Sequence, residues 1–209
     1  DNKVLSLGSS AAKGYYLSPD PASSPILDLD GGGVMDNSTS VAVHLGNDKT
    51  IGYLTVGTTK LIKFNPASDM LEETITKAGV DNFTGLARVR TLAGTDLVGK
   101  VFVADTTTNR VVRYLDYSLG NPVVVTASSP IDMAISGNYL LTLESDGKIG
   151  VYYVSGTENT FVMRFGGTTA NGAFTGATGI CCSGKDLFLL EPGANSVRVI
   201  RSGLTNWLK

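Results

Sequence analysis

The hydrophobic positions of this chain come in short runs, separated by turns rich in Gly, Asn, Asp and Thr. In Lys100–Tyr114, four apolar residues lead to Asp105, three threonines follow, and Asn109 precedes a second apolar run. Short apolar runs bounded by such turn residues are typical of β-hairpins. Because these runs are apolar at nearly every position rather than at alternate ones, both faces of each strand are expected to be buried.

This hairpin pattern recurs along the chain. Three copies end their first run with a carboxylate, at Asp105, Glu144 and Glu191, and the outer two carboxylates are 86 positions apart, which is two periods of 43. Five hairpins follow one another at intervals of roughly 39 to 48 residues, at 14–18 leading into 25–30, 52–64, 100–114, 139–152 and 186–200.

Two further strand candidates flank most of the hairpins, which gives a unit of four short strands. The upstream candidates are Val41–Leu45, Gly85–Val89, Ile131–Ile135 and Thr178–Cys182. The downstream candidates are Leu71–Thr76, Pro122–Thr126, Thr160–Phe165 and Leu204–Leu208. Asp69–Glu72 could instead start a helical turn, but the repeat favours a strand over 71–76.

Four strands in roughly 42 residues are the size of one β-propeller blade. A twisted sheet with two apolar faces must stack on its neighbours, and repeated stacking closes a ring. We therefore predict an all-β fold, a single β-propeller domain over residues 1–209, with about five four-stranded blades, or six of which one is incomplete. The approximate blade limits are 1–38, 39–80, 81–127, 128–166 and 167–209. Asn2–Leu7 and Leu204–Leu208 are expected to meet where the ring closes.

The segment Phe102–Val111 resembles the NHL repeat, whose core has a strand ending in Val-Ala-Asp, a small turn and then Asn-Arg-Val. Pro192–Val197 is a degenerate copy, and the other hairpins keep the hydrophobic shape without the Asn-Arg pair. The resemblance is thus specific in one repeat. It implies a propeller, usually of six blades, so a count of five implies a five-bladed ring or a chain that lacks one blade.

Charge and composition narrow the class of partner. Charged residues make up 17% of the 209 positions, the net charge is -2 and the pI is about 5.4. Nucleic-acid binding needs a concentrated positive field, so we expect no nucleic-acid partner, and an RNA-binding NHL domain is disfavoured. The apolar runs are far shorter than the roughly 20 residues of a membrane helix, so we expect no membrane insertion.

The recurring carboxylates Asp105, Glu144 and Glu191 have two interpretations. They could gather on one face of the ring and bind a cation or a polar ligand. Alternatively, each could accept hydrogen bonds from the backbone of its own turn, which is favoured because a periodic feature first reflects a periodic structure. Asn109 is expected to adopt a left-handed backbone in its turn, as is Asn195, and Arg110 is expected to pair with Asp105 across the hairpin.

The most site-like loop is Asp28–Asn37, which contains Asp28, Asp30 and Asp36 around three glycines. Oxygen donors beside glycines suit calcium, which takes six to eight oxygen ligands. The loop lacks the regular spacing of an EF-hand, so a Gly-rich turn is the alternative. We therefore expect no cofactor, with calcium at these three aspartates as the exception.

The remaining candidates are few. His44 is the one histidine of the chain and lies in an apolar strand, which favours a core or channel-lining position. Cys181 and Cys182 are adjacent, and a disulfide between neighbours is strained, so two free thiols are expected. Asn37 and Asn82 begin Asn-x-Ser/Thr sequons and would be glycosylated if a eukaryote secretes the protein. Of the Tyr152–Tyr153 pair, at least one ring should pack between blades.

These observations favour a non-enzymatic binding or structural module, extracellular or secreted. Its loops would bind a protein or a glycan, or support self-association, because a rigid propeller carries its function on loops. The alternative is an enzyme that resembles the lactonase, esterase or lyase propellers, with a metal held by acids and amides at the central channel. One histidine excludes a histidine-rich metal site, and leaves Asp105, Glu144 and Glu191 as the candidate ligands.

Overall fold

The computed structural model of this chain is all-β. It describes residues 4–7, 14–17, 38–45, 50–56, 60–65, 70–76, 87–91, 101–105, 108–114, 123–155, 158–166, 174, 176–184 and 186–201. Side chains are described from residue 101 onward within these ranges, except at positions 155 and 158. In this part of the chain the strands form five separate antiparallel sheets, and each strand pairs with the one before or after it in sequence.

The first sheet has two strands and the second has four. The first consists of β1 (Val4–Leu7) and β2 (Gly14–Leu17). The second consists of β3 (Ser38–Leu45), β4 (Thr50–Val56), β5 (Lys60–Asn65) and β6 (Met70–Thr76).

The third and fourth sheets also have four strands, and the fifth has three. The third consists of β7 (Ala87–Thr91), β8 (Val101–Asp105), β9 (Arg110–Tyr114) and β10 (Val123–Thr126). The fourth consists of β11 (Pro130–Ser136), β12 (Tyr139–Glu144), β13 (Lys148–Ser155) and β14 (Glu158–Gly166). The fifth consists of β15 (Gly179–Ser183), β16 (Asp186–Glu191) and β17 (Ser196–Ile200).

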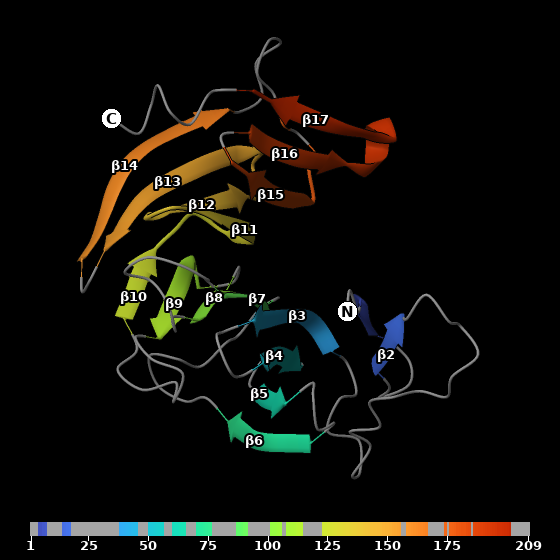
Figure 1. The fold of residues 1–209 in the computed structure, drawn as a ribbon. Helices are drawn as coiled ribbons and strands as arrows, with labels where there is room; N and C mark the ends of the chain where they lie inside the picture. Colours follow the sequence, from blue (N-terminus) through green and yellow to red (C-terminus); the bar gives the residue numbers. More distant parts are fainter. Residues whose placement is uncertain are drawn as a thin grey trace.

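The sheets follow one another around a common centre, with the first strand of each four-stranded sheet on the inside (Figure 1). Strand β3 packs against β7, β7 against β11, and β11 against β15. The outer strands, such as β6 and β14, lie away from this centre. This is the radial stacking of sheets that the two-sided apolar hairpins predicted.

Burial confirms that the hairpin strands have two covered faces. All five residues of β8 are buried, and so are five of the six residues of β12. Because successive side chains point to opposite faces, each of these sheets must be covered on both sides. For the β11–β14 sheet, one cover is the β7–β10 sheet and the other is the β15–β17 sheet.

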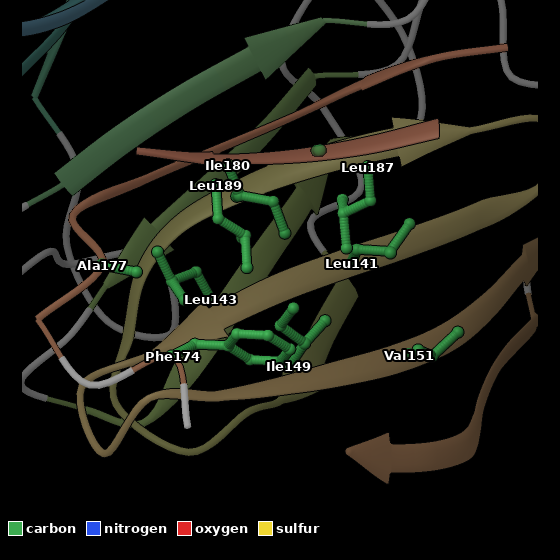
Figure 2. Close-up of a cluster of buried hydrophobic side chains, with 10 residues drawn as sticks. Leu141, Leu143, Ile149, Val151, Phe174, Ala177, Ile180, Leu187 and Leu189 are labelled. Atoms are coloured by element: carbon green, nitrogen blue, oxygen red, sulfur yellow. The ribbon is translucent and has the colours of Figure 1, made fainter. Parts of the chain in front are cut away.

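Two apolar clusters form these contacts between sheets. One joins the third sheet to the fourth and contains Phe102, Ala104, Val111, Leu140 and Tyr152 among others. The other joins the fourth sheet to the fifth, and Figure 2 shows Leu141, Leu143 and Ile149 facing Leu187 and Leu189 across it. Each fully buried aliphatic side chain contributes about 1.5–3 kcal/mol to folding, so these clusters supply much of the stability.

Most strand predictions agree with the structure. Met70–Thr76 is a strand, as the repeat favoured, and Tyr152 is buried between sheets as expected for one residue of the tyrosine pair. The first hairpin is different, since Gly14–Leu17 pairs with Val4–Leu7. Residues 25–30, its predicted partner, lie outside the described residues. Leu204–Leu208 also lies outside them, so its contact with the N-terminus and the blade limits remain predictions.

Candidate binding groove

The three carboxylates predicted to share a role occupy equivalent positions, at the last residue of the second strand of their sheets. All three are buried, and each forms an ion pair with an arginine of its own sheet. The nitrogen-to-oxygen distances are 3.6 Å for Asp105–Arg110, 2.9 Å for Glu144–Arg164 and 3.0 Å for Glu191–Arg198. The predicted Asp105–Arg110 pair is thus confirmed, and Glu144 and Glu191 also have arginine partners, on β14 and β17 respectively.

These pairs bear on both interpretations of the carboxylates. In the described part of the chain, no three His, Cys, Asp or Glu residues are grouped closely enough to hold a metal ion. In the β12–β13 turn, the turn hydrogen bond is made by another residue, since Asp146 Oδ1 accepts from the Lys148 backbone N–H at 3.1 Å. Each carboxylate therefore has a cationic partner across its sheet, and ligand binding by Asp105, Glu144 and Glu191 stays a prediction.

The turn asparagines have the predicted left-handed backbone, with φ of 54° at Asn109 and 49° at Asn195. The side chain of Asn109 does more than was predicted. Its Oδ1 accepts hydrogen bonds from the backbone N–H and the hydroxyl of Ser129, at 2.8 and 2.7 Å, and this links the β8–β9 turn to the connection between sheets three and four.

Most of the other predicted site residues lie outside the described part of the chain. The calcium candidates Asp28, Asp30 and Asp36 lie outside the described residues, as do the sequon residues Asn37 and Asn82. His44 lies in β3, and its side chain is not described. Cys181 and Cys182 are free thiols, as predicted. Among the described residues, no helix has the length and apolar character needed to cross a membrane.

The structure brings a different set of residues together at the outer side of the third and fourth sheets. A hollow of about 220 Å³ lies there, which we call the outer groove. Two of its residues expose large apolar surfaces, since Phe161 is 53% exposed and Val124 is 42% exposed. The lining residues come from β10, β13 and β14: Val124, Val125, Thr126, Tyr152, Asn159 and Phe161.

A β-bulge positions the exposed aromatic ring of the groove. Along β13 and β14, Val151 pairs with Met163 but Tyr152 pairs with Phe161, so Val162 is the extra residue. Such a bulge changes which side chain faces a given side of a sheet. As a result, Phe161 lies on the same face as Tyr152, and their rings meet edge to face with centroids 5.6 Å apart.

A polar cluster supports the groove from within the β11–β14 sheet. The Arg164 guanidinium lies 5.6 Å from the centre of the Phe161 ring, and its Nε is paired with Glu144. Because Gly150 has no side chain, Thr142 and Glu144 can lie close to the backbone of β13. A Cβ at this position would lie 2.8 Å from Thr142 Oγ1 and 3.0 Å from Glu144 Oε1. The cation is thereby held against the ring by a buried carboxylate.

Burial sets the electrostatics of the cluster. Burial raises the pKa of Glu144 above its ordinary value, and the hydrogen bond and charge of Arg164 oppose this rise only in part. The pKa of Tyr152 is also raised, first by burial and then by the negative charge of Glu144. For Arg164, burial would lower the pKa, but the hydrogen bond and charge of Glu144 outweigh it, so the pKa is raised. Arg164 therefore keeps its positive charge at neutral pH.

One acceptor in the groove has no hydrogen-bond donor among the described residues. This acceptor is Asn159 Oδ1, which is buried. A buried acceptor without a donor is costly, and a ligand N–H or O–H would relieve that cost. Together with the Phe161 ring and the Arg164 charge, this arrangement suits a ligand that combines an apolar face with hydrogen-bond donors, such as a sugar or a peptide.

The sequence indicated only part of this groove. Glu144 was singled out by its place in the repeat, and Tyr152 as a ring between blades. Phe161, Asn159 and Arg164 were missed, because their positions on one face depend on the bulge in β14, and a bulge leaves no periodic trace in a sequence.

Comparison with known proteins identifies the fold. No protein-family model and no curated protein matches the sequence. Among solved structures, the computationally designed Ika4 protein is 13% identical, with a TM-score of 0.56, over 87% of this chain and 99% of that one. Nidogen, in a nidogen/laminin complex, is similar at 10% identity and a TM-score of 0.60, over 87% of this chain and 64% of its match.

An enzyme structure is also similar. Streptogramin B lyase is 12% identical, with a TM-score of 0.55, over 79% of this chain. This chain spans 51% of the lyase, so it corresponds to about half of that protein's length. Identities this low bear on the fold alone. The sheets in the structure and these similarities together show that the chain is a β-propeller.

Proposed function

We propose that this chain is a non-enzymatic binding module in which the outer groove binds a protein or a glycan. The proposal agrees with the general behaviour of propellers, whose rigid stacked sheets present binding surfaces at their edges and loops. The fold similarity alone does not select this function, because the similar structures include both nidogen, from a complex with laminin, and a lyase.

The observation that carries the proposal is the combination of Phe161 and Asn159 in one hollow with Arg164 beside the Phe161 ring. Phe161 is more than half exposed although it stacks on a buried tyrosine, so the ring offers a firm apolar face to solvent. Asn159 adds an acceptor that lacks a donor among the described residues, and Arg164 adds a fixed positive charge. Aromatic and arginine side chains with adjacent polar groups dominate the energetics of recognition surfaces.

We further propose an extracellular or secreted location and an NHL-like repeat. The sequons at Asn37 and Asn82 and the low charged fraction support the location. The Val-Ala-Asp and Asn-Arg-Val elements of Phe102–Val111 support the repeat. Detection of N-glycans on the protein isolated from its native source would test the location.

The experiment for the groove is a selection with two probe sets, a glycan array and a phage-displayed peptide library, on the purified full chain. The expected result is at least one glycan or peptide class that binds the wild type and loses binding in Phe161→Ala. Thr160→Ala is the matched control, because Thr160 is an exposed neighbour on the same strand whose side chain faces away from the groove. Ligands that bind Phe161→Ala and the wild type equally, or an absence of binders in both sets, would refute the proposal.

The metal-dependent enzyme remains the competing hypothesis and has its own test. It requires Asp105, Glu144 or Glu191 to break its ion pair with an arginine and to bind a cation instead. Elemental analysis of the purified protein, with thermal unfolding in the presence and absence of a chelator, separates the two. A bound metal at one equivalent together with a fall in Tm on chelation would favour the enzyme.

A further inference from the structure

Strand β14 ends the fourth sheet, and its outer edge is open in the described part of the chain. The strand pairs with β13 on one side, and no described strand lies beyond it on the other. None of residues 159–166 is buried, whereas all but one of the residues of β12 in the same sheet are. Outside the bulge, every second residue of β14 therefore turns its backbone N–H and C=O outward, where another strand can pair with them.

This edge has few of the features that protect an edge strand from pairing. Edge strands in natural proteins are often short, or contain proline or lysine. Strand β14 has nine residues and contains neither proline nor lysine. It also exposes two neighbouring apolar side chains, Phe161 at 53% and Val162 at 41%. A long, apolar edge of this kind is a surface to which an extended segment adds as a further strand.

The bulge at Val162 divides the edge into two parts. Since a bulge interrupts strand pairing, an added strand is expected to follow one part only. The part before the bulge contributes both β14 residues of the outer groove, Asn159 and Phe161. Asn159 pairs with Val154 and Phe161 with Tyr152, and these two β13 residues belong to the cluster between the third and fourth sheets. Asn159 and Phe161 therefore lie on the face toward the third sheet.

A strand added at 158–161 places alternate side chains over the groove. Cross-strand neighbours lie on the same face of a sheet, with Cβ atoms about 4.5–5.5 Å apart. An apolar side chain opposite Phe161 therefore enters the hollow between the Phe161 ring and the β10 residues Val124 and Val125. The residue two positions along lies opposite Asn159, where a hydroxyl or amide donor reaches Oδ1, an acceptor without a donor in the described chain.

We propose that the outer groove binds an extended peptide segment of a partner protein, which pairs with β14 at 158–161 and places an apolar side chain beside Phe161 and a hydrogen-bond donor beside Asn159. This inference rests on the proposed binding role of the groove and narrows its ligand from a protein or a glycan to a peptide. A sugar ring stacked on Phe161 would use the hollow alone, whereas a peptide uses the hollow and the open backbone edge. Because Arg164 is already paired with Glu144, the groove-facing residues of the peptide are expected to be uncharged.

The first experiment tests the backbone pairing from the side of the ligand. The probe is the tightest-binding linear peptide from the phage-displayed library, synthesised with an N-methyl group at one position at a time. N-methylation removes a backbone donor, and alternate N–H groups of an added strand point toward β14. Affinity for the full chain should therefore fall at least about tenfold at every second position, with little change at the positions between. If N-methylation at every position leaves the affinity of a Phe161-dependent peptide unchanged, the inference is overturned while the proposed function stands.

The second experiment tests the same pairing from the side of the protein. Amide hydrogen exchange is measured by NMR in the full chain, with and without a saturating amount of the same peptide. The outward amides of 158–161, which exchange fast in the free chain, should slow at least about tenfold on binding. Strand β17 is the matched control edge, because it also ends its sheet in the described structure and four of its five residues are exposed. Its amides should be unaffected, and slowing at β17 instead of at 158–161 would contradict the inference.

The remaining outcomes identify other occupants of the groove. Phe161-dependent binding of glycans without any peptide would overturn the inference but support the proposed function. Slow exchange at 158–161 that increases with protein concentration in the absence of peptide would assign the edge to a second copy of the chain, and would also overturn the inference. If no peptide and no glycan binds in a Phe161-dependent manner, the inference and the proposed function are both wrong.

Discussion

The two faces of the β11–β14 sheet are built from alternate residues of the same strands, yet they differ in kind. The face toward the fifth sheet is apolar throughout its centre, with Leu141, Leu143, Ile149 and Val151 all fully buried (Figure 2). The face toward the third sheet contains Thr142, Glu144, Gly150, Tyr152 and Arg164. The first face is packed with apolar side chains throughout, whereas the second combines apolar residues such as Leu140 and Val154 with a polar cluster and borders a hollow. Function is therefore expected on the second face, where the repeat departs from its own hydrophobic pattern.

The largest effect should come from the apolar face. Leu143→Ala removes a fully buried side chain from the cluster between sheets four and five, and should lower the free energy of unfolding by about 2–5 kcal/mol. Urea denaturation measures this change. Phe161→Ala deletes more atoms on the other face, but its ring is 53% exposed, so it should cost less than Leu143→Ala. Equal losses in the two variants would contradict the division between the faces.

Gly150→Ala should have the next largest effect. The added Cβ would lie 2.8 Å from Thr142 Oγ1, and forcing apart a packed cluster costs about 1–3 kcal/mol. Glu144 and Tyr152 are also within about 3.0 Å of this position, so the Glu144–Arg164 pair should be displaced. The measurement is again urea denaturation, with Gly150→Ala/Thr142→Ala as the matched variant that recovers part of the loss. Wild-type stability in Gly150→Ala would show that the cluster is not tightly packed.

The smallest effect concerns pH. Because burial raises the pKa of Glu144 in the folded chain above the unfolded value near 4.5, the folded state binds this proton more tightly. This contribution to stability is therefore present below pH 4.5 and is lost as pH rises through the raised folded pKa. In Glu144→Gln it is absent at every pH, so the stability of the variant relative to the wild type should improve as pH rises above 4.5. Unfolding curves at several pH values measure the difference, and a change of opposite sign would contradict it.

The sequence predicted the architecture because the architecture is periodic. Four apolar residues before Asp105 and again before Glu191 indicated strands buried on both faces, and stacking follows from that alone. The left-handed turns at Asn109 and Asn195 were predictable from the same repeat. The pairing of Glu144 with Arg164 was not, because these residues are 20 positions apart and meet across two strand pairings. Nor was the place of Phe161, which depends on one bulged residue, Val162.

The measurement that tests the central claim most directly is the affinity of Phe161→Ala for a glycan or peptide that the wild type binds. Both proteins should be folded at the assay temperature, since Phe161 contributes little to the apolar clusters. The account predicts an affinity at least about tenfold weaker in Phe161→Ala, as for the loss of a central aromatic contact, and no change in Thr160→Ala. An unchanged affinity in Phe161→Ala would show that the ligand binds elsewhere and that the outer groove is not the binding site.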